Sequence, residues 1–250
     1  MRITDAELFE LALRAANCLP KTNRSIGTEN ETTLHSALKY CFQPDPKFHE
    51  LRISGYICDA FSGTTVYEIQ TRQLYKLRRK LSVLLPEYRL TVIYPVITEK
   101  RVVLSDADGN VVREYKSPKK GSIMALAAEL YGIREFLTHP RFSVAAVYLS
   151  VTEMRKLTAG KRKKSTVTDK IPEKFSHVEF FREAEAYRSL LPESLADSFT
   201  AADFFRAAKV PEKTGRPALN VLTVTGAVMK TGKSGRCILY SKTSQHSETV

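Results

Sequence analysis

The chain of 250 residues is long enough for one large domain or two small ones, and its hydrophobic content of 43% is that of a globular protein with a substantial core. Its 39 Lys and Arg outnumber its 27 Asp and Glu, which gives a net charge of +12. Such a charge favours a polyanionic partner, and nucleic acid is favoured over an acidic membrane. A basic surface that serves only solubility is the alternative. No apolar run approaches the length of a transmembrane helix.

Acidic side chains interrupt the first segment of the chain, at Asp5, Glu7 and Glu10, so we expect no signal peptide. The four cysteines include no C-x-x-C pair and have no histidine at zinc-binding spacing. We therefore expect a cytoplasmic protein with reduced, mostly buried thiols and no membrane partner.

Two helices are predicted near the N-terminus from the spacing of apolar residues. The first covers residues 5–19 and is followed by a basic loop over residues 21–27. The second begins near Thr28 and is closed by Pro44 and Pro46. Its buried stripe is expected to consist of Leu34, Ala37, Leu38 and Cys41.

A β-hairpin with polar side chains in apolar strands is predicted next. Its arms are residues 49–59 and 65–71, joined by a Ser-Gly-Thr turn. Since side chains alternate along a strand, Glu68 and Gln70 share one face of the second arm, and Asp59 at the end of the first arm can lie beside them. Acidic groups in such strands need a compensating charge, and oxygen ligands of this type suit Mg²⁺ or Mn²⁺.

Asp59, a spacer of eight residues and then Glu68-Ile69-Gln70 resemble the core motif of the PD-(D/E)XK nuclease superfamily, which has the restriction-endonuclease-like fold. That motif has an Asp at the end of one strand and Glu-x-Lys on the next, so Gln70 stands in place of the Lys. The resemblance implies that Asp59, Glu68 and the Ile69 carbonyl oxygen hold Mg²⁺ or Mn²⁺, and that Gln70 orients the attacking water. By order of elements it covers roughly the first two-thirds of the chain.

In the same family an acidic residue on the preceding helix faces the metal, and Glu31 is the residue implied here. Thr28-Glu-Asn-Glu31 is also a capping box, which by itself explains a Glu three residues after a Thr, and both roles stay open. His35 and Lys39 follow Glu31 at four-residue intervals on a polar face of the helix. We expect Lys39 to contact phosphate groups. We expect His35 to contact phosphate or to support a metal ligand rather than bind the metal itself, and a purely structural role for His35 is the alternative.

Leucines at helical spacing predict a helix over residues 72–85. Arg72, Lys76 and Lys80 lie off its apolar stripe. They form either a solvated face or a set of phosphate contacts beside the metal site, and we favour the second interpretation. Lys76 and Lys39 are also candidates to supply the positive charge that the missing lysine of the motif would carry.

The remaining elements of this domain alternate between strands and a helix. An apolar strand over residues 89–96 completes a β-α-β crossover. Residues 101–104 and 111–115 predict short strands about an Asp-Ala-Asp-Gly-Asn turn, whose spacing is wrong for an EF-hand. A helix over residues 122–136 and a buried strand over residues 143–150 follow.

Residues 159–176 are polar and include the run Lys161-Arg-Lys-Lys164. We expect a linker whose charges either contact the phosphate backbone or are simply solvated. It would join a nuclease-like domain at residues 1–158 to a second module at residues 177–243. A polar tail at residues 244–250 is expected to be disordered.

The second module is predicted to contain three helices and then a hairpin, an order that resembles a winged helix. The helices are residues 177–191, a helix capped by Thr200, and residues 215–225. In a winged helix the third helix enters the major groove and the hairpin lies along the backbone. The residues implied to contact DNA are Lys213, Arg216 and Asn220 on the helix, with Lys230, Lys233 and Arg236 on the hairpin. A winged helix used only for protein contact is the alternative.

The sequence therefore predicts an α/β protein with a restriction-endonuclease-like mixed sheet flanked by helices and a C-terminal winged-helix domain. We expect a metal-dependent endonuclease that acts on duplex DNA. A non-catalytic DNA-binding regulator on the same scaffold and an RNA nuclease are the alternatives, and a homodimer is left open.

Overall fold

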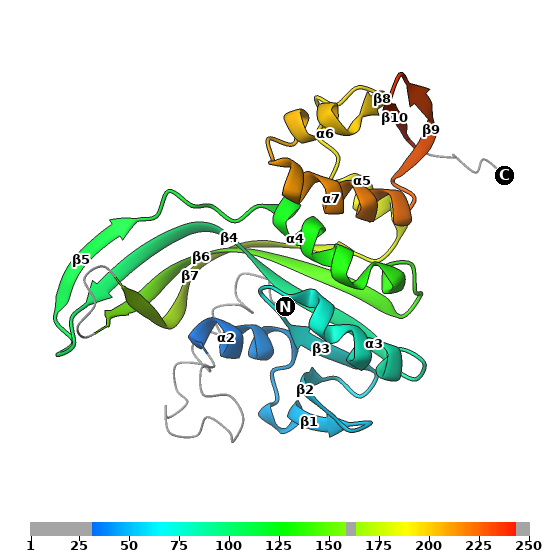
Figure 1. Ribbon diagram of the computed structural model, residues 1–250. Helices are drawn as coiled ribbons and strands as arrows, with labels where there is room; N and C mark the ends of the chain where they lie inside the picture. Colours follow the sequence, from blue (N-terminus) through cyan, green and yellow to red (C-terminus); the bar gives the residue numbers. More distant parts are fainter. Residues whose placement is uncertain (1–31, 159–163, 244–250) are drawn as a thin grey trace, which may run out of the picture. The chain divides into compact units, whose positions relative to one another are not determined.

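The computed structural model of the chain describes residues 32–158 and 164–243 (Figure 1). These residues form two compact units that alternate along the sequence. The sheet unit comprises the described residues up to Gln70, together with Thr91–Ser122 and Ala145–Glu179. The helical unit comprises Thr71–Leu90, Ile123–Val144 and the described residues from Phe180 onward.

The main sheet has seven strands in the order β1-β2-β3-β4-β6-β7, with β5 paired to β4. The strands are His49–Ile53 (β1), Tyr56–Phe61 (β2), Thr65–Ile69 (β3), Arg89–Ser105 (β4), Val111–Lys116 (β5), Phe142–Leu157 (β6) and Ser165–Phe181 (β7). Strands β1, β2 and β3 are antiparallel neighbours, as are β4 and β5. The hydroxyl of Thr98 donates a hydrogen bond to the Leu149 carbonyl oxygen, and Arg101 Nε donates to the Thr152 hydroxyl. The two contacts are three residues apart on both β4 and β6, so these strands run in the same direction. The sheet is therefore mixed.

Helix α2 (Thr33–Phe42) packs on the main sheet within the sheet unit (Figure 1). Its N-cap is Thr32, whose hydroxyl accepts the His35 N–H. Asp169 of β7 accepts the N–H of Thr33 at 2.7 Å and its hydroxyl at 2.6 Å, so a carboxylate complements the helix dipole. The apolar residues buried between helix and strands are Leu34, Leu38, Ile69, Ile93, Ala145, Val147, Leu149 and Val151.

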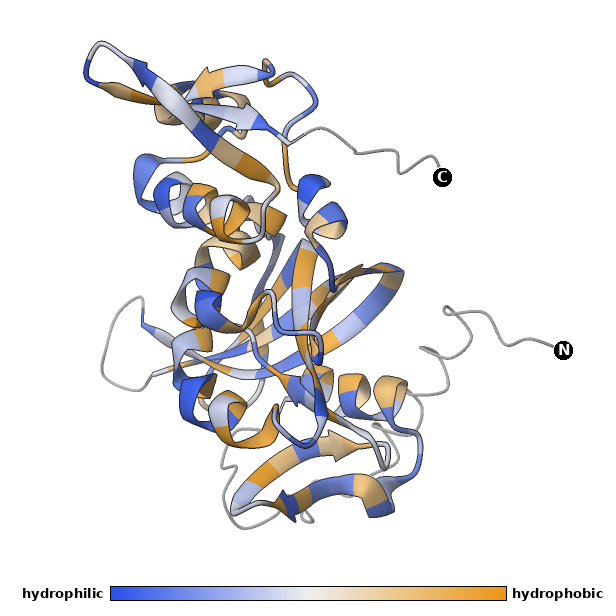
Figure 2. Ribbon diagram, turned by 90° about the vertical axis from the view of Figure 1, so that its right-hand side faces the viewer, coloured by the Kyte–Doolittle hydropathy of each residue, from blue (hydrophilic) through white to orange (hydrophobic). Residues whose placement is uncertain are grey.

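The helical unit contains seven helical segments and a small sheet among its described residues. The helices are Leu74–Leu77 (η2), Arg78–Leu84 (α3), Ile123–Leu130 (α4), Tyr131–Phe136 (η3), Ala184–Arg188 (α5), Ala201–Ala207 (α6) and Glu212–Val224 (α7). The sheet has the order β8-β10-β9, from Ser198–Thr200 (β8), Val228–Ser234 (β9) and Cys237–Lys242 (β10). Figure 2 shows hydrophobic and hydrophilic residues mixed along the helices, as in amphipathic helices that bury one face.

Local signals in the helical unit match the predictions closely. Thr200 caps α6 through a capping box with Asp203, as expected from their spacing. Leu219 and Leu222 of α7 are buried, as predicted, and α7 contacts both α4 and α6. In η2 and α3 the predicted stripe of Leu74, Leu77, Leu81 and Leu84 is buried.

The predicted hairpin over residues 49–71 is wrong in one respect, because its first arm is itself a hairpin. Ile53 pairs with Tyr56, and the two residues between them, Ser54 and Gly55, have φ angles of 46° and 88°. Positive φ at both central residues is the signature of a tight type I′ turn. The segment therefore folds into the three strands β1, β2 and β3.

The predicted boundaries in the second half of the sheet also need correction. Residues 89–96 and 101–104 were expected as separate strands, but they form the single strand β4. Residues 165–176 of the expected linker and 177–181 of an expected helix form the strand β7. Strand β7 ends the sheet, so it has one strand neighbour and stays polar, which is why its composition resembles a linker. Only Ala184–Arg188 of the expected helix is helical.

Some predictions lie outside the described residues. These are the first helix, the basic loop over residues 21–27, Glu31, residues 161–163 of the basic run and the tail. The second helix begins at Thr33, after the Thr32 cap, and not near Thr28. The mixed α/β architecture, with a large mixed sheet and helix α2 packed on it, agrees with the prediction.

Candidate active site

Three acidic residues occupy adjacent positions on the three neighbouring strands β1, β2 and β3. The β2–β3 pairs Phe61 with Val66 and Ala60 with Tyr67 continue, one position further, to Asp59 opposite Glu68. The β1–β2 pairs His49 with Ala60 and Leu51 with Cys58 enclose Glu50 opposite Asp59. We call Glu50, Asp59 and Glu68 the carboxylate row, and it includes the two acids that sequence reasoning had expected to converge.

Sequence reasoning missed Glu50. While residues 49–59 are treated as one strand, Glu50 lies far from Asp59 along that strand. The tight turn at Ser54-Gly55 folds the strand back and brings the two positions together. The recognisable signal was the Ser-Gly pair inside an apolar run, which favours a turn. Glu50 itself has a φ of 53°, which is uncommon for a residue other than glycine.

Asp59 is held by two contacts from different elements. Its Oδ2 accepts the N–H of Ile69, at the end of β3, at 2.7 Å. The same oxygen lies 3.5 Å from Nε2 of His35 on α2, and the Asp59 side chain is 25% exposed. A carboxylate that accepts a backbone N–H and faces an imidazole has a fixed orientation, so the position of Asp59 depends on both β3 and α2.

Lys39 brings a positive charge to the carboxylate row from α2. Its Nζ lies 2.9 Å from Oε1 of Glu50, and its side chain is only 6% exposed. In a poorly solvated place an ammonium ion needs such a partner. Lys39, one of the two lysines proposed to replace the one missing from the Glu-x-Gln motif, therefore lies beside a carboxylate of the row. The sequence predicts a phosphate contact for this side chain, and in the structure it pairs with Glu50.

The other members of the predicted motif lie at the end of β3. Glu68 is buried, with 5% of its surface exposed, and Ile69 is buried beside it. The Gln70 N–H donates to the carbonyl oxygen of Ile93 on β4, while the Gln70 side chain is half-buried. Glu31, the remaining predicted acid, lies outside the described residues.

The donors of the carboxylate row are of the kind that a divalent cation prefers. Carboxylate and carbonyl oxygens are the ligands that Mg²⁺ and Mn²⁺ prefer, and the row provides the first kind in adjacent positions. In the described part of the chain, no three Asp, Glu, His or Cys side chains already converge as a ligand shell. A cation would therefore combine a small number of these side chains with main-chain oxygen atoms or water.

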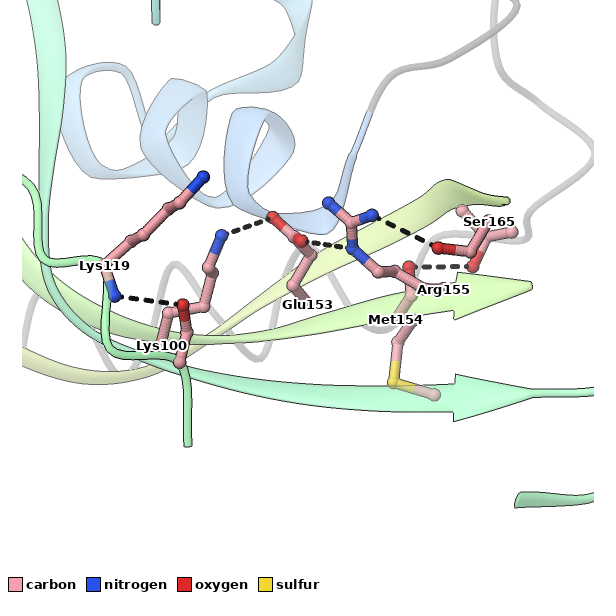
Figure 3. Close-up of polar contacts among 8 residues, drawn as sticks. Lys100, Lys119, Glu153, Met154, Arg155 and Ser165 are labelled. Atoms are coloured by element: carbon pink, nitrogen blue, oxygen red, sulfur yellow. Dashed lines mark hydrogen bonds and ion pairs between the residues drawn. The ribbon is translucent and has the colours of Figure 1, made fainter. Parts of the chain in front are cut away.

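A second polar cluster lies on β6 in the sheet unit. The Glu153 side chain is 5% exposed, and its two oxygens receive Lys100 Nζ at 3.3 Å and Arg155 Nε at 2.6 Å. Burial alone would raise the pKa of the Glu153 carboxyl, but the hydrogen bond from Arg155 and the charge of Lys100 lower it on balance. Figure 3 shows the side chains of Lys100, Lys119 and Arg155 on the same side of the strands as Glu153. This cluster is a structural ion-pair network between β4 and β6.

The cations predicted to contact DNA in the helical unit differ in exposure. Arg72 and Lys76 are exposed, whereas Lys80 is buried at 9% exposure. On α7 the three predicted residues Lys213, Arg216 and Asn220 are all exposed, and Arg216 Nε pairs with Oε1 of Glu212 at 2.5 Å.

The hairpin bases, Lys230, Lys233 and Arg236, are exposed as well. The turn of this hairpin is Gly235-Arg236, because Ser234 pairs with Cys237, so β9 extends further than predicted. Lys230 and Lys233 therefore lie on the strand and Arg236 in the turn. All three remain available to a charged partner.

These features define a mixed α/β protein with an acidic row at one end of its main sheet. Residues 32–182 match the family described as "Domain of unknown function (DUF8091)", and the chain belongs to this family. The match runs from the N-cap of α2 to the residue after β7, so it includes the whole main sheet and the carboxylate row. No solved structure matches the chain.

The similarity to a relative extends over most of the chain. An "Uncharacterized protein" of Treponema pallidum (strain Nichols) is 32% identical over 226 residues, which are 87% of this chain and 88% of that protein. The region shared with this relative is longer than the family match, so the similarity is not confined to the main sheet. Among the described residues, none of the helices is long and apolar enough to span a membrane.

Proposed function

We propose that the chain is a metal-dependent nuclease that cleaves DNA at the carboxylate row. The observation that carries the proposal is the register of the three strands, which sets Glu50, Asp59 and Glu68 side by side, with the buried ammonium of Lys39 beside Glu50. Adjacent carboxylates repel one another, and a cation bound between them would relieve that repulsion.

The order of elements gives independent support. A helix, three antiparallel strands, a helical segment and a further strand follow one another as α2, β1, β2, β3, α3 and β4. The resemblance to the PD-(D/E)XK superfamily requires a helix, then an Asp near the end of one strand and the Glu on the next strand. Asp59 on β2 and Glu68 on β3, after α2, are consistent with that requirement.

In this proposal Asp59 and Glu68 are the metal ligands of the row, and Glu50 holds the Lys39 ammonium in place. The ligands of Mg²⁺ or Mn²⁺ would be Asp59, Glu68 and the Ile69 carbonyl oxygen. A bound cation would lower the pKa of a water molecule and neutralise charge at the phosphate. His35 and the Ile69 N–H keep Asp59 oriented. Lys39 would supply the positive charge that Gln70 lacks.

We propose a winged helix for the C-terminal module. The order α5-β8-α6-α7-β9-β10, with a sheet ordered β8-β10-β9, supports this interpretation. In such a module α7 would present Arg216 and Asn220 to base edges, where Arg pairs with guanine and Asn with adenine. The hairpin bases would contact phosphate groups.

A non-catalytic DNA-binding protein is the second candidate. The observation that favours it is that Asp59 and Glu50 already contact groups of the protein itself, the Ile69 N–H and the Lys39 ammonium. Such contacts would stabilise a nuclease-like scaffold without any metal. The two candidates differ in whether the purified protein hydrolyses phosphodiester bonds.

Cleavage of duplex DNA, single-stranded DNA and RNA in Mg²⁺ or Mn²⁺ tests the proposal. We expect DNA cleavage that Glu68→Gln reduces by at least about 100-fold, because it removes a proposed metal ligand. Lys39→Ala should also reduce it, because it removes a positive charge beside the reacting phosphate. Glu87→Gln, at an exposed position of the helical unit, is the matched control and should leave the rate unchanged. Activity that survives Glu68→Gln would refute the site, and inactivity on every substrate would favour the second candidate.

A further inference from the structure

A groove lies in the helical unit and shares no residue with the carboxylate row. It is formed by η2, α4, the start of η3 and α7, and its volume of about 440 Å³ lies within the range of about 300–1,000 Å³ typical of small-molecule sites. Its lining residues are Gln73, Tyr75, Ala125, Ala128, Glu129, Gly132, Lys213, Thr214 and Pro217. Small side chains thus form much of the lining, and the larger ones are an aromatic ring, an amide and two charged groups.

Specific contacts fix the elements that form the groove relative to one another. Glu129 Oε2 on α4 accepts the N–H of Leu74 at 3.2 Å, which fixes the start of η2. Gly132 lets η3 approach η2 closely, because a Cβ at that position would lie 2.9 Å from the Cβ of Tyr75. The backbone of Tyr75 is therefore fixed, while the residue as a whole is 53% exposed.

Gln73 adds a strained position at the edge of the groove. It has φ 59° and ψ 43°, the left-handed conformation, and its side chain makes no hydrogen bond that caps η2. A residue other than glycine in this conformation is strained, and such residues cluster at binding sites. In this conformation the Gln73 side chain lines the groove instead of capping the helix.

We propose that this groove binds an unpaired nucleotide of a single-stranded nucleic acid. The exposed ring of Tyr75 offers a surface on which a base can stack, and Lys213 offers a cation for the adjoining phosphate. The Gln73 amide can both donate to and accept from a base edge.

Charge favours a nucleic acid over a protein segment as the occupant. The Glu129 carboxylate already accepts a backbone N–H, whereas Lys213 is exposed at the groove. Arg72 and Lys76, which neighbour Gln73 and Tyr75 in the sequence, are exposed as well, so the segment that carries Tyr75 is basic. The inference rests on the proposed function only in taking nucleic acid as the ligand, and it needs neither metal nor cleavage.

A fluorescence titration tests the proposal. The chain contains no Trp, so Tyr75→Trp creates a protein whose single indole reports on the groove. Adding a single-stranded oligothymidine in the presence of a chelator should quench this indole, since bases stack on indole rings. Tyr131→Trp is the matched control, because Tyr131 is exposed and lies outside the groove lining, and its fluorescence should not change.

Affinity measurements on the full chain complete the test. Tyr75→Ala should weaken binding of the oligothymidine by roughly 5- to 150-fold, the range for loss of one base–aromatic stack. Tyr75→Phe should retain binding because it retains the ring. Ala125→Leu, at an exposed position of the lining, should fill the groove and weaken binding while leaving the melting temperature unchanged.

The two proposals fail in different ways. Asp59→Asn should abolish cleavage and leave oligothymidine binding in chelator intact. Quenching at Tyr131→Trp equal to that at Tyr75→Trp, or unchanged affinity in both Tyr75→Ala and Ala125→Leu, would overturn the groove proposal whatever the cleavage assay shows. A change in the Tyr75→Trp fluorescence with a helical peptide but not with the oligothymidine would assign the groove to a protein partner. That result would also overturn the groove proposal.

Discussion

The packing of α6 against α7 can be tested at Gly215, which faces the ring of Phe205. A Cβ added at Gly215 would lie 2.2 Å from Cδ1 and 2.6 Å from Cε1 of that ring, whereas carbon atoms in contact prefer about 3.5–4.0 Å. The half-buried ring would have to move outward, and overpacking of this kind costs about 1–3 kcal/mol. Because replacing a helical Gly by Ala gains about 1 kcal/mol, Gly215→Ala should lower the free energy of unfolding by up to about 2 kcal/mol.

A double-mutant cycle measures this contact directly. In a Phe205→Ala background the ring is gone, so Gly215→Ala should raise the free energy of unfolding by about 1 kcal/mol, the gain in helix propensity. The coupling energy from urea unfolding of the four proteins, followed by circular dichroism, should then be about 1–3 kcal/mol. Gly232→Ala is the control, since a Cβ there meets nothing within 4 Å, and it should be additive with Phe205→Ala. Additivity at Gly215 to within about 0.5 kcal/mol would refute the predicted contact.

Three further outcomes follow from the charges and thiols. Burial raises the pKa of the Cys41 thiol to about 12. In a Cys18→Ser background, a thiol reagent at pH 8 should therefore modify exposed Cys237 quickly and Cys41 slowly. Rapid labelling after Cys237→Ser is added to that background would contradict this. The pKa of Glu153 is lowered in the folded protein, so its ion pairs stabilise the fold above the ordinary carboxyl pKa. This stabilisation is lost as the pH falls through the folded-state pKa. Glu153→Gln should therefore melt well below the wild type at neutral pH, and the difference should shrink below about pH 4. Replacing the three hairpin bases by Ala should flatten the plot of log K for duplex DNA against log salt by about three units, and an unchanged slope would exclude phosphate contacts by the hairpin.

Local features of the fold could be predicted from the sequence. The Thr200 cap, the leucine stripe of η2 and α3, the buried side of α7 and the turn between β4 and β5 each depend on a few neighbouring residues. The register that sets Asp59 opposite Glu68 also follows from strand alternation about one short turn. Such features need no knowledge of distant partners.

The remaining features depend on contacts between distant parts of the chain. Strand β7 has the composition of a linker, and its conformation is determined by pairing with β6 and by the contact of Asp169 with the start of α2. Glu50 joins the carboxylate row only because Ser54-Gly55 forms a tight turn in a segment that otherwise has the pattern of one strand. The ion pair of Lys39 with Glu50 requires α2 and β1 to pack together, which the periodicity of either segment alone does not predict.

Calorimetric titration of Mn²⁺ or Mg²⁺ into metal-free protein tests the proposed metal centre most directly. Asp59 and Glu68 are adjacent in the strand register, so the wild-type protein should bind the cation at the row, and Asp59→Asn and Glu68→Gln should each abolish the saturable heat. Asp108→Asn, in the exposed turn between β4 and β5, should bind as the wild type does. No binding at millimolar cation, or binding that both Asp59→Asn and Glu68→Gln retain, would contradict a metal centre at the carboxylate row.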